Sequence, residues 1–264
     1  MNSSFFKLNS ILVALILIFF SNISFAKESH VDLLKPNWSF DGFFGTFDRA
    51  SLQRGYQVYK EVCASCHSMK LVSYRNLSQE GGPEFTEEEV KAIASQFEIT
   101  DGPNADGEMF ERPGLPSDRF KSPYLNDNAS RASNGGAYPP DMSVLVKARP
   151  GGSNYIYSVL MGYEEKIPEN IKLEEGVYYN KYMTGNKIRM SQPLMEGIVD
   201  YTDGTKATEK QMAKDVVSFL TWAAEPHLEA RKKLGFKSVI YLLILTILVY
   251  LIKKKIWSRI EPKV

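Results

Sequence analysis

The sequence contains few residues of the kinds that most often bind metals, because its 264 residues include only two cysteines and three histidines. A structural zinc site normally takes four ligands from Cys and His. The cysteines are Cys63 and Cys66, and two of the histidines, His30 and His227, lie far from them near the edges of the expected folded region. The spacing therefore does not fit a zinc finger.

The sequence also lacks internal repeats, low-complexity tracts and a strong net charge, which is formally +1 at pH 7. Its proportions of hydrophobic (44%), charged (24%) and aromatic (12%) residues are those of a folded protein with a sizeable core, and they exclude a disordered or collagen-like chain. No basic stripe with interleaved aromatic residues occurs in the body of the sequence, so we do not expect nucleic-acid binding.

The small net charge hides a division along the chain. Residues 27–226 contain 22 basic and 29 acidic side chains, a formal charge of −7, whereas residues 229–264 contain 9 basic and 2 acidic side chains, a formal charge of +7. An acidic body with a basic tail predicts two environments, a soluble partner for the body and a membrane surface for the tail.

Both ends of the sequence carry targeting or membrane signals. Lys7, the apolar run ILVALILIFF (11–20) and small residues at 24 and 26 predict a signal peptide over residues 1–26, cleaved after Ala26. Its composition favours bacterial export over a mitochondrial transit peptide. Its apolar run is short for a membrane span of about 20 residues.

The C-terminal region contains a long run that is uncharged and strongly apolar throughout, SVIYLLILTILVYLI (238–252). Extended to residues 234–252, with Lys237 snorkelling, it gives about 28 Å of helix at ~1.5 Å per residue, which matches a bilayer core. We therefore expect a transmembrane anchor helix at 234–252, a basic cytoplasmic tail at 253–264, and an exported domain at 27–233.

Three stretches between these segments have helical patterns. Leu52, Tyr56, Tyr59 and Cys63 recur at steps of four, three and four, which predicts a helix with the first cysteine on its inward face. Capping-box pairs begin the other two helices, at Thr86 with Glu89 and at Thr208 with Gln211. The apolar faces expected for these two helices are Val90, Ile93 and Phe97 for the first, and Met212, Val216, Phe219, Leu220 and Ala223 for the second.

Residues 101–152 are rich in Gly, Pro, Asn and Asp, which favours long irregular loops over a sheet. Loops of this length in a folded body usually surround something functional. The fold class expected is thus mostly α, with long irregular loops around a non-protein core, plus one C-terminal transmembrane helix.

The stretch EVCASCHSMK (61–70) contains both cysteines, and Cys63, Cys66 and His67 form a C-x-x-C-H motif. A thioredoxin-like redox pair would follow a strand, whereas here a helix is expected, and two free thiols so close together are unusual in an exported protein. The motif is the signature of covalent haem c attachment: two thioethers reach one porphyrin, and His67 ligates its iron. An opposing Met ligand would indicate electron transfer. Met69 is too close to His67 for that position, and spacing leaves Met183, Met190 and Met195 as candidates.

The sequence resembles the cytochrome c1 family, the haem subunit of the cytochrome bc1 complex. The resemblance covers nearly all of the expected mature chain through CASCH, DGPNADGEMFERPG, NGGAYPPDMSVLVKAR, DYTDGTKAT and AKDVVSFLTWAAEP, followed by the apolar C-terminal run. It implies that the mostly α body is a cytochrome c-like haem domain with long irregular loops. It also implies that the axial methionine is Met190, in IRMSQPL, and that Arg131 pairs with a haem propionate. Arg189 stands where many members have Gly or Ala.

The resemblance also implies partners and a location. They are cytochrome b, a Rieske iron–sulfur protein that donates one electron at a time, a cytochrome c that accepts it, and the bacterial inner membrane, with the haem domain periplasmic and the complex dimeric. The acidic body could attract a basic cytochrome c through Glu87–Glu89, Glu164 with Glu165, or Glu174 with Glu175, and each patch could equally be a solvated surface.

Two other classes fit the haem motif less well. A dihaem peroxidase would carry a second C-x-x-C-H, which the sequence lacks, and a gas sensor would lack the methionine ligand and usually adjoin a signalling domain. The expected chain is not an enzyme by itself, because an iron with six ligands has no position free for a substrate.

Overall fold

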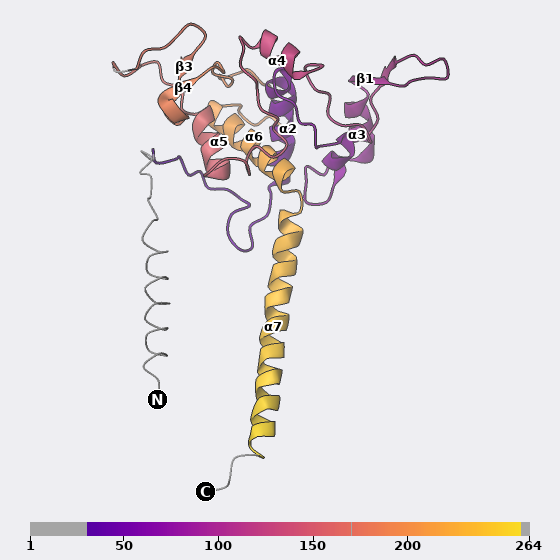
Figure 1. Ribbon diagram of the computed structural model, residues 1–264, viewed down its shortest axis with the longest axis vertical. Coiled ribbons are helices and arrows are strands. Elements are labelled where there is room, and N and C mark those ends of the chain that lie inside the picture. Colours follow the sequence, from indigo (N-terminus) through magenta and orange to yellow (C-terminus); the bar gives the residue numbers. More distant parts are fainter. Residues whose placement is uncertain (1–30, 170, 260–264) are drawn as a thin grey trace, which may run out of the picture. The chain divides into compact units, whose positions relative to one another are not determined.

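The computed structural model describes residues 31–169 and 171–259, so the expected signal peptide at 1–26 lies outside the described residues. Residues from Leu33 onward belong to one unit, and the following account concerns that unit. It is mostly helical, as expected (Figure 1). The helices are α2 (Arg49–Glu61), α3 (Glu87–Ala94), α4 (Asp127–Ser133), α5 (Gly152–Leu160), α6 (Glu209–Ala224) and α7 (Leu228–Trp257), with 3-10 turns η1 (Cys63–Ser65), η2 (Tyr74–Ser78) and η3 (Thr184–Asn186).

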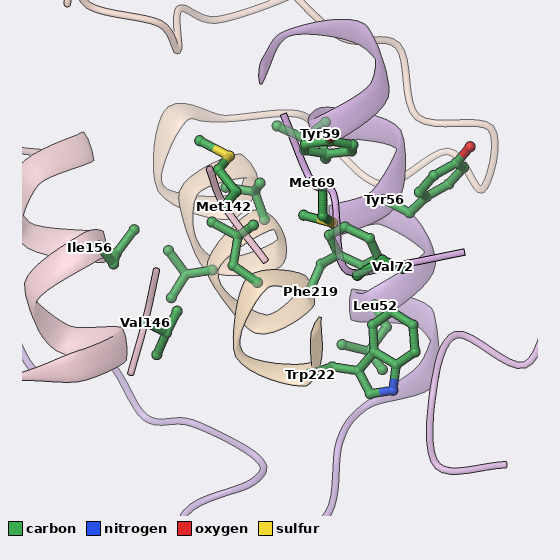
Figure 2. Packing of buried hydrophobic residues seen from close by; sticks show 14 of the residues in the cluster. Leu52, Tyr56, Tyr59, Met69, Val72, Met142, Val146, Ile156, Phe219 and Trp222 are labelled. Carbon is green, nitrogen blue, oxygen red and sulfur yellow. The ribbon is translucent and has the colours of Figure 1, made fainter. Parts of the chain in front are cut away.

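The centre of the fold is the packing of α2 against α6. The inward face of α2 (Leu52, Tyr56 and Tyr59) meets Phe219 and Trp222 of α6, as Figure 2 shows. All five side chains are buried. The helices approach most closely at Gly55, where a Cβ atom would lie only 2.1 Å from the Asp215 carbonyl oxygen. Glycine is therefore required at this crossing.

A buried ion pair fixes the register of the same two helices. The Asp215 carboxylate of α6 is fully buried and accepts hydrogen bonds from Arg54 Nε at 2.8 Å, Ser51 Oγ at 2.6 Å and Gln211 Nε2 at 3.0 Å. A buried carboxylate is tolerated only when its oxygens are paired in this way. The α2–α6 contact is thus specified by polar bonds as well as by apolar burial.

The three helices expected from the sequence are confirmed, but α3 ends at Ala94, so Phe97 lies outside the helix on whose apolar face it was expected. Thr86 and Glu89 form a reciprocal capping box at α3, and the Thr208 side chain accepts the Gln211 N–H at α6. A further correction is needed at the first helix, within which Cys63 was expected. That helix ends at Glu61, and Cys63 begins the 3-10 turn η1, although its side chain still packs against the core.

The glycine- and proline-rich region has more structure than the sequence predicted. Strands β1 (Glu98–Asp101) and β2 (Phe110–Pro113) pair antiparallel in a hairpin, and α4 follows them. The expectation of loops instead of a sheet was therefore wrong for this hairpin. Helix α5 was not predicted either. A second, shorter hairpin pairs β3 (Tyr178–Tyr179) with β4 (Lys187–Ile188) and leads directly to Met190.

The C-terminal apolar run forms α7, which is longer than the expected 234–252. It is continuous from Leu228 to Trp257, has an 18-residue window with a mean hydropathy of 2.2, and is long and apolar enough to cross a membrane. Its window is not buried against the rest of the protein. These properties fit a transmembrane anchor.

Candidate haem site

The two cysteines and His67 lie on a tight turn directly after α2. The backbone N–H groups of Cys66 and His67 both donate to the Cys63 carbonyl, at 3.1 and 2.9 Å. This turn holds the C-x-x-C-H motif together because the backbone of Cys66 and of His67 is bonded to the carbonyl of Cys63. Both thiols are free and partly exposed, so they remain accessible for attachment of a group.

The hydrogen bond made by His67 determines which of its ring nitrogens is available. The side chain is 8% exposed, and its Nδ1 lies 2.8 Å from the Pro140 carbonyl oxygen. A carbonyl can only accept, so Nδ1 carries the hydrogen and the lone pair is on Nε2. Burial lowers the pKa of His67 below its ordinary value, which also favours the neutral ring. The imidazole is thus held in the tautomer that a metal ligand requires.

Asp141 holds the Pro140 carbonyl in place. Its Oδ2 accepts from Ser68 Oγ and from the Lys70 N–H, both at 2.8 Å, and its Oδ1 accepts from the Ser143 N–H at 2.9 Å. Burial alone would raise the pKa of this carboxyl, but these hydrogen bonds lower it overall. An ionised Asp141 therefore bonds both to the residues that follow His67 and to the residues that follow Pro140, and so holds the two segments together.

The Cys63 thiol has the character of a neutral group instead of a thiolate. Burial, and secondarily the neighbouring Cys66, raises the pKa of the Cys63 thiol to about 12. Zinc sites and redox pairs use thiolates, whose pKa is lowered by positive neighbours. Among the described residues, no three His, Cys, Asp or Glu side chains are grouped as a metal site would require. The donor set of two thiols and one imidazole instead matches the covalent haem motif.

The three candidate methionines have different environments. The Met183 sulfur accepts a hydrogen bond from Tyr155 Oη at 3.4 Å, which ties it to α5. Met195 is 55% exposed. Met190 is half-buried, and its carbonyl accepts from Tyr163 Oη at 2.9 Å, so the backbone at this residue is fixed. Met69, excluded on spacing, is fully buried in the core (Figure 2).

One segment, residues 134–141, contacts both the His67 and the Met190 regions. Pro140 accepts from His67, and Gly135 accepts from the Arg189 guanidinium at 3.1 Å, next to Met190. The two candidate ligands are therefore linked through the same loop. Arg131, in α4 just before this segment, is exposed and lies over the Tyr138 ring at 5.1 Å.

The family model described as the cytochrome C1 family matches residues 38–260, which is most of the chain. The chain belongs to the cytochrome c1 family. Its similarity to curated cytochromes c1 is consistent over long alignments from bacteria and from a plant.

Three relatives illustrate this similarity. "Cytochrome c1" of Rhodospirillum rubrum is 47% identical over 251 residues, covering 89% of this chain and 91% of that protein. "Cytochrome c1 1, heme protein, mitochondrial" of Arabidopsis thaliana is 47% identical over 249 residues, covering 94% and 80%. "Cytochrome b/c1" of Bradyrhizobium diazoefficiens is 50% identical over 239 residues, covering 84% of this chain but only 35% of that longer protein.

The positioning residues of this cytochrome c1 site were not found from the sequence. Asp141 and Pro140 lie more than 70 positions from His67, and Tyr163 lies 27 positions from Met190. A proline pair followed by Asp is an ordinary turn pattern, so it carries no signal of a contact with the haem motif.

Proposed function

We propose that this cytochrome c1 carries one covalently attached haem c and is the electron-transfer subunit of a cytochrome bc1 complex in a respiratory chain. The observation that carries the proposal is the buried His67 ring, whose Nδ1–H is donated to Pro140 and whose Nε2 is left for a metal, on one turn with Cys63 and Cys66. When bound, the haem supplies one-electron redox chemistry.

Each residue of the site then has a distinct task. Cys63 and Cys66 attach the cofactor through thioethers, and His67 ligates its iron. The Pro140 carbonyl sets the tautomer and ring orientation of His67, and Asp141 keeps that carbonyl in position. Outer contacts of this kind orient a ligand and increase its basicity.

Met190 is the methionine best suited to be the second ligand. Its backbone is held by Tyr163, its neighbour Arg189 is held by Gly135, and its side chain is neither tied up as Met183 is nor as exposed as Met195. Ligation by Met190 as well as His67 would raise the reduction potential of the haem iron and would leave it no coordination position for a substrate. The chain by itself then transfers electrons without a substrate site.

Arg131 is proposed to pair with a haem propionate. It is a cation on α4, close in sequence to the 134–141 loop that contacts both ligand regions. Within residues 31–169 and 171–259, its guanidinium contacts the Tyr138 face and makes a long, 3.5 Å bond to the Gly136 carbonyl, which leaves donors for a carboxylate.

The proposed electron path runs from a Rieske iron–sulfur protein to a cytochrome c, with cytochrome b as the membrane partner. We place the haem domain on the periplasmic side of a bacterial inner membrane, with α7 as its single span and the complex dimeric. The acidic body supports a basic acceptor, because complementary charge speeds brief docking.

The test is to purify the complex and treat the chain with acidified acetone, which extracts only haem that is not covalently bound. We expect one haem per chain to stay attached after this treatment. In a separate assay of the untreated complex, we expect the haem to be reduced by quinol when the iron–sulfur protein is present and to be oxidised by cytochrome c. Extraction of the haem would refute covalent attachment. Reduction by quinol without the iron–sulfur protein would refute the proposed donor.

A further inference from the structure

We infer that residues 39–46, the aromatic loop, form a second membrane contact, which inserts Phe43 and Phe44 into the outer interface of the lipid bilayer beside α7. Both rings are exposed, at 57% and 75% of their surface. Two adjacent exposed phenylalanines are unusual on a surface that faces only water, because burying each ring in an apolar phase is favourable.

The loop lies against the outer end of the expected membrane span. Ring centroids of Phe43 and Phe44 lie 6.0 and 5.6 Å from that of Phe236 in α7, and 5.0 Å from each other. Phe236 is itself 42% exposed. The three rings therefore form one aromatic cluster that continues the apolar surface of α7.

The position of Phe236 sets the depth of this cluster. It is seven residues from Leu243, the middle of the expected span at 234–252, or about 10 Å along the helix. The half-thickness of the hydrocarbon core is about 15 Å. The cluster is thus expected in the outermost part of the hydrocarbon, about 5 Å inside its boundary, and the exposed cations Lys233 and Lys237 can reach the headgroups above it.

The loop is rigid enough to present its rings in this position. Lys232 Nζ of α7 donates to the carbonyls of Phe40 and Gly42, both at 2.6 Å, and of Gly45 at 3.2 Å. The Thr46 N–H closes the loop onto the Ser39 carbonyl at 3.1 Å.

The sequence of the loop also favours this fixed shape. A Cβ at Gly45 would lie 1.9 Å from the Asp41 carbonyl oxygen, so only glycine permits the turn. Because the loop is already folded, insertion of its rings costs little further ordering.

Lipid is favoured over a protein partner because the cluster is continuous with the membrane helix. A membrane contact by the aromatic loop also requires that α7 be the membrane span, so the test includes that helix. The experiment uses the full-length protein in its purified complex, reconstituted in bilayer nanodiscs of phosphatidylcholine and phosphatidylglycerol. A nitroxide spin label is attached at Phe44→Cys, and its accessibility to dissolved oxygen and to a water-soluble nickel chelate is measured.

Three controls accompany this label. Asp106→Cys, exposed in the β1–β2 hairpin, reports water, and Leu243→Cys reports the middle of the expected span. Unsubstituted protein measures background labelling at Cys63 and Cys66. Phe43→Cys provides an independent second site if Phe44→Cys does not fold.

We expect the ratio of oxygen to nickel accessibility at Phe44→Cys to be several-fold higher than at Asp106→Cys and to approach that at Leu243→Cys. A ratio equal to that of Asp106→Cys would overturn the inference, because the loop would be in water. Exclusion of both reagents at Phe44→Cys would also overturn it, in favour of a protein partner. A Leu243→Cys label in water would overturn the span itself and with it the membrane contact.

Discussion

At the scale of single residues, the protein uses buried hydrogen bonds to fix groups that would otherwise have several arrangements. His67 has one tautomer because Pro140 accepts from its Nδ1, and Pro140 is fixed because Asp141 binds residues on both sides. The C-x-x-C-H motif by itself specifies only which residues are near the cofactor. The contacts across the chain specify their orientation.

Asp141→Asn tests this arrangement. The variant replaces one carboxylate oxygen by an amide NH2 group, which cannot accept from the N–H and O–H donors that face it. The side chain also loses its charge, and hydrogen bonds to a charged group are each worth about 1.5 to 3 kcal/mol. We expect the free energy of unfolding of the full-length protein in detergent to fall by at least this amount in denaturant titrations. The matched variant Asp106→Asn, at an exposed hairpin position, should leave it nearly unchanged. Equal effects of the two substitutions would contradict the role given to Asp141.

At the scale of the elements, two contacts hold the fold together: the close crossing of α2 with α6, and the attachment of α7 to the body. The first depends on Gly55, where the two backbones approach without room for a side chain. The second depends on Glu229, near the start of α7. Its carboxylate accepts from the Phe47 N–H at 2.8 Å and from the Arg49 guanidinium at 2.8 and 3.0 Å.

Gly55→Ala tests the crossing. A methyl group 2.1 Å from the Asp215 carbonyl forces the helices apart, and overpacking of this kind costs about 1 to 3 kcal/mol or more. We therefore expect a lower thermal midpoint for the full-length protein. Gly235→Ala in α7, where a Cβ meets nothing within 4 Å, is the matched control and should not lower it. A midpoint unchanged by Gly55→Ala would show that the helices are not packed this closely.

Glu229→Gln tests the attachment of α7 and predicts a pH dependence. Burial would raise the pKa of Glu229, but the hydrogen bond from Arg49 and the Phe47 N–H lower it overall. A lowered pKa in the folded state means that the carboxylate stabilises the fold above its unfolded pKa of about 4.3, and that this stability is lost as the pH falls through the folded pKa. We expect the variant to be less stable by about 2 kcal/mol at pH 7.

The measurement is the thermal midpoint of both proteins from pH 7 down to acid. The gap between wild type and Glu229→Gln should narrow as the pH falls. Glu84→Gln removes a more exposed partner of the same Arg49 and should have a smaller effect at every pH, because exposed ion pairs contribute little. A gap that stays constant with pH would contradict the assignment.

The sequence predicted elements whose causes are local. The capping signals at Thr86 and Thr208 and the uncharged run of α7 are readable in a few neighbouring residues, and all three helices form. The capping box is complete at Thr86, whereas at Thr208 only the side chain accepts from the Gln211 N–H and the Gln211 side chain bonds to Asp215 instead. Helices α4 and α5 were missed because they are short and lie among turn residues. Helix α5 even begins from Gly151 in a left-handed conformation, at φ +85°.

The candidate site was predictable in part for the same reason. Cys63, Cys66 and His67 lie within five residues of sequence, so the motif was visible. Asp141 and Tyr163 act through contacts between residues far apart in the sequence, which exist only in the folded protein. Spacing left three methionines open, and only the resemblance pointed to Met190. The Tyr155 bond to Met183 and the exposure of Met195 now give physical reasons for the same choice.

At the scale of the whole molecule, charge separates an acidic body from a basic C-terminal segment. The structure refines which acidic residues are available for a partner. Glu89 is engaged in its capping box with Thr86, so charge reversal there would also disturb α3, and the charge of Glu164 is offset by Lys181 at 3.6 Å. The exposed carboxylates that remain in the expected patches are Glu87, Glu88, Glu165, Glu174 and Glu175.

Charge reversal to Lys at these five positions tests their role in docking. We expect the KM for a basic cytochrome c to rise in quinol oxidation assays of the complex, most strongly at low ionic strength, because salt screens exposed charges over about 10 Å at 0.1 M. Reversal of the basic residues Lys121 and Lys172 to Glu is the opposite-sign control and should not raise the KM. An unchanged KM in the five-residue variant at low salt would exclude these patches as the docking surface.

We propose that His67 and Met190 both ligate the haem iron, which leaves no position for a substrate and makes electron transfer its function. The measurement that tests it most directly is the visible and near-infrared spectrum of Met190→Leu beside wild type, oxidised and reduced, with and without carbon monoxide. If Met190 is the ligand, wild type shows the weak near-infrared band of Met-ligated ferric haem and does not bind carbon monoxide. Met190→Leu then loses the band and binds carbon monoxide. Carbon monoxide binding by wild type, or a band that persists in the variant, would contradict the account.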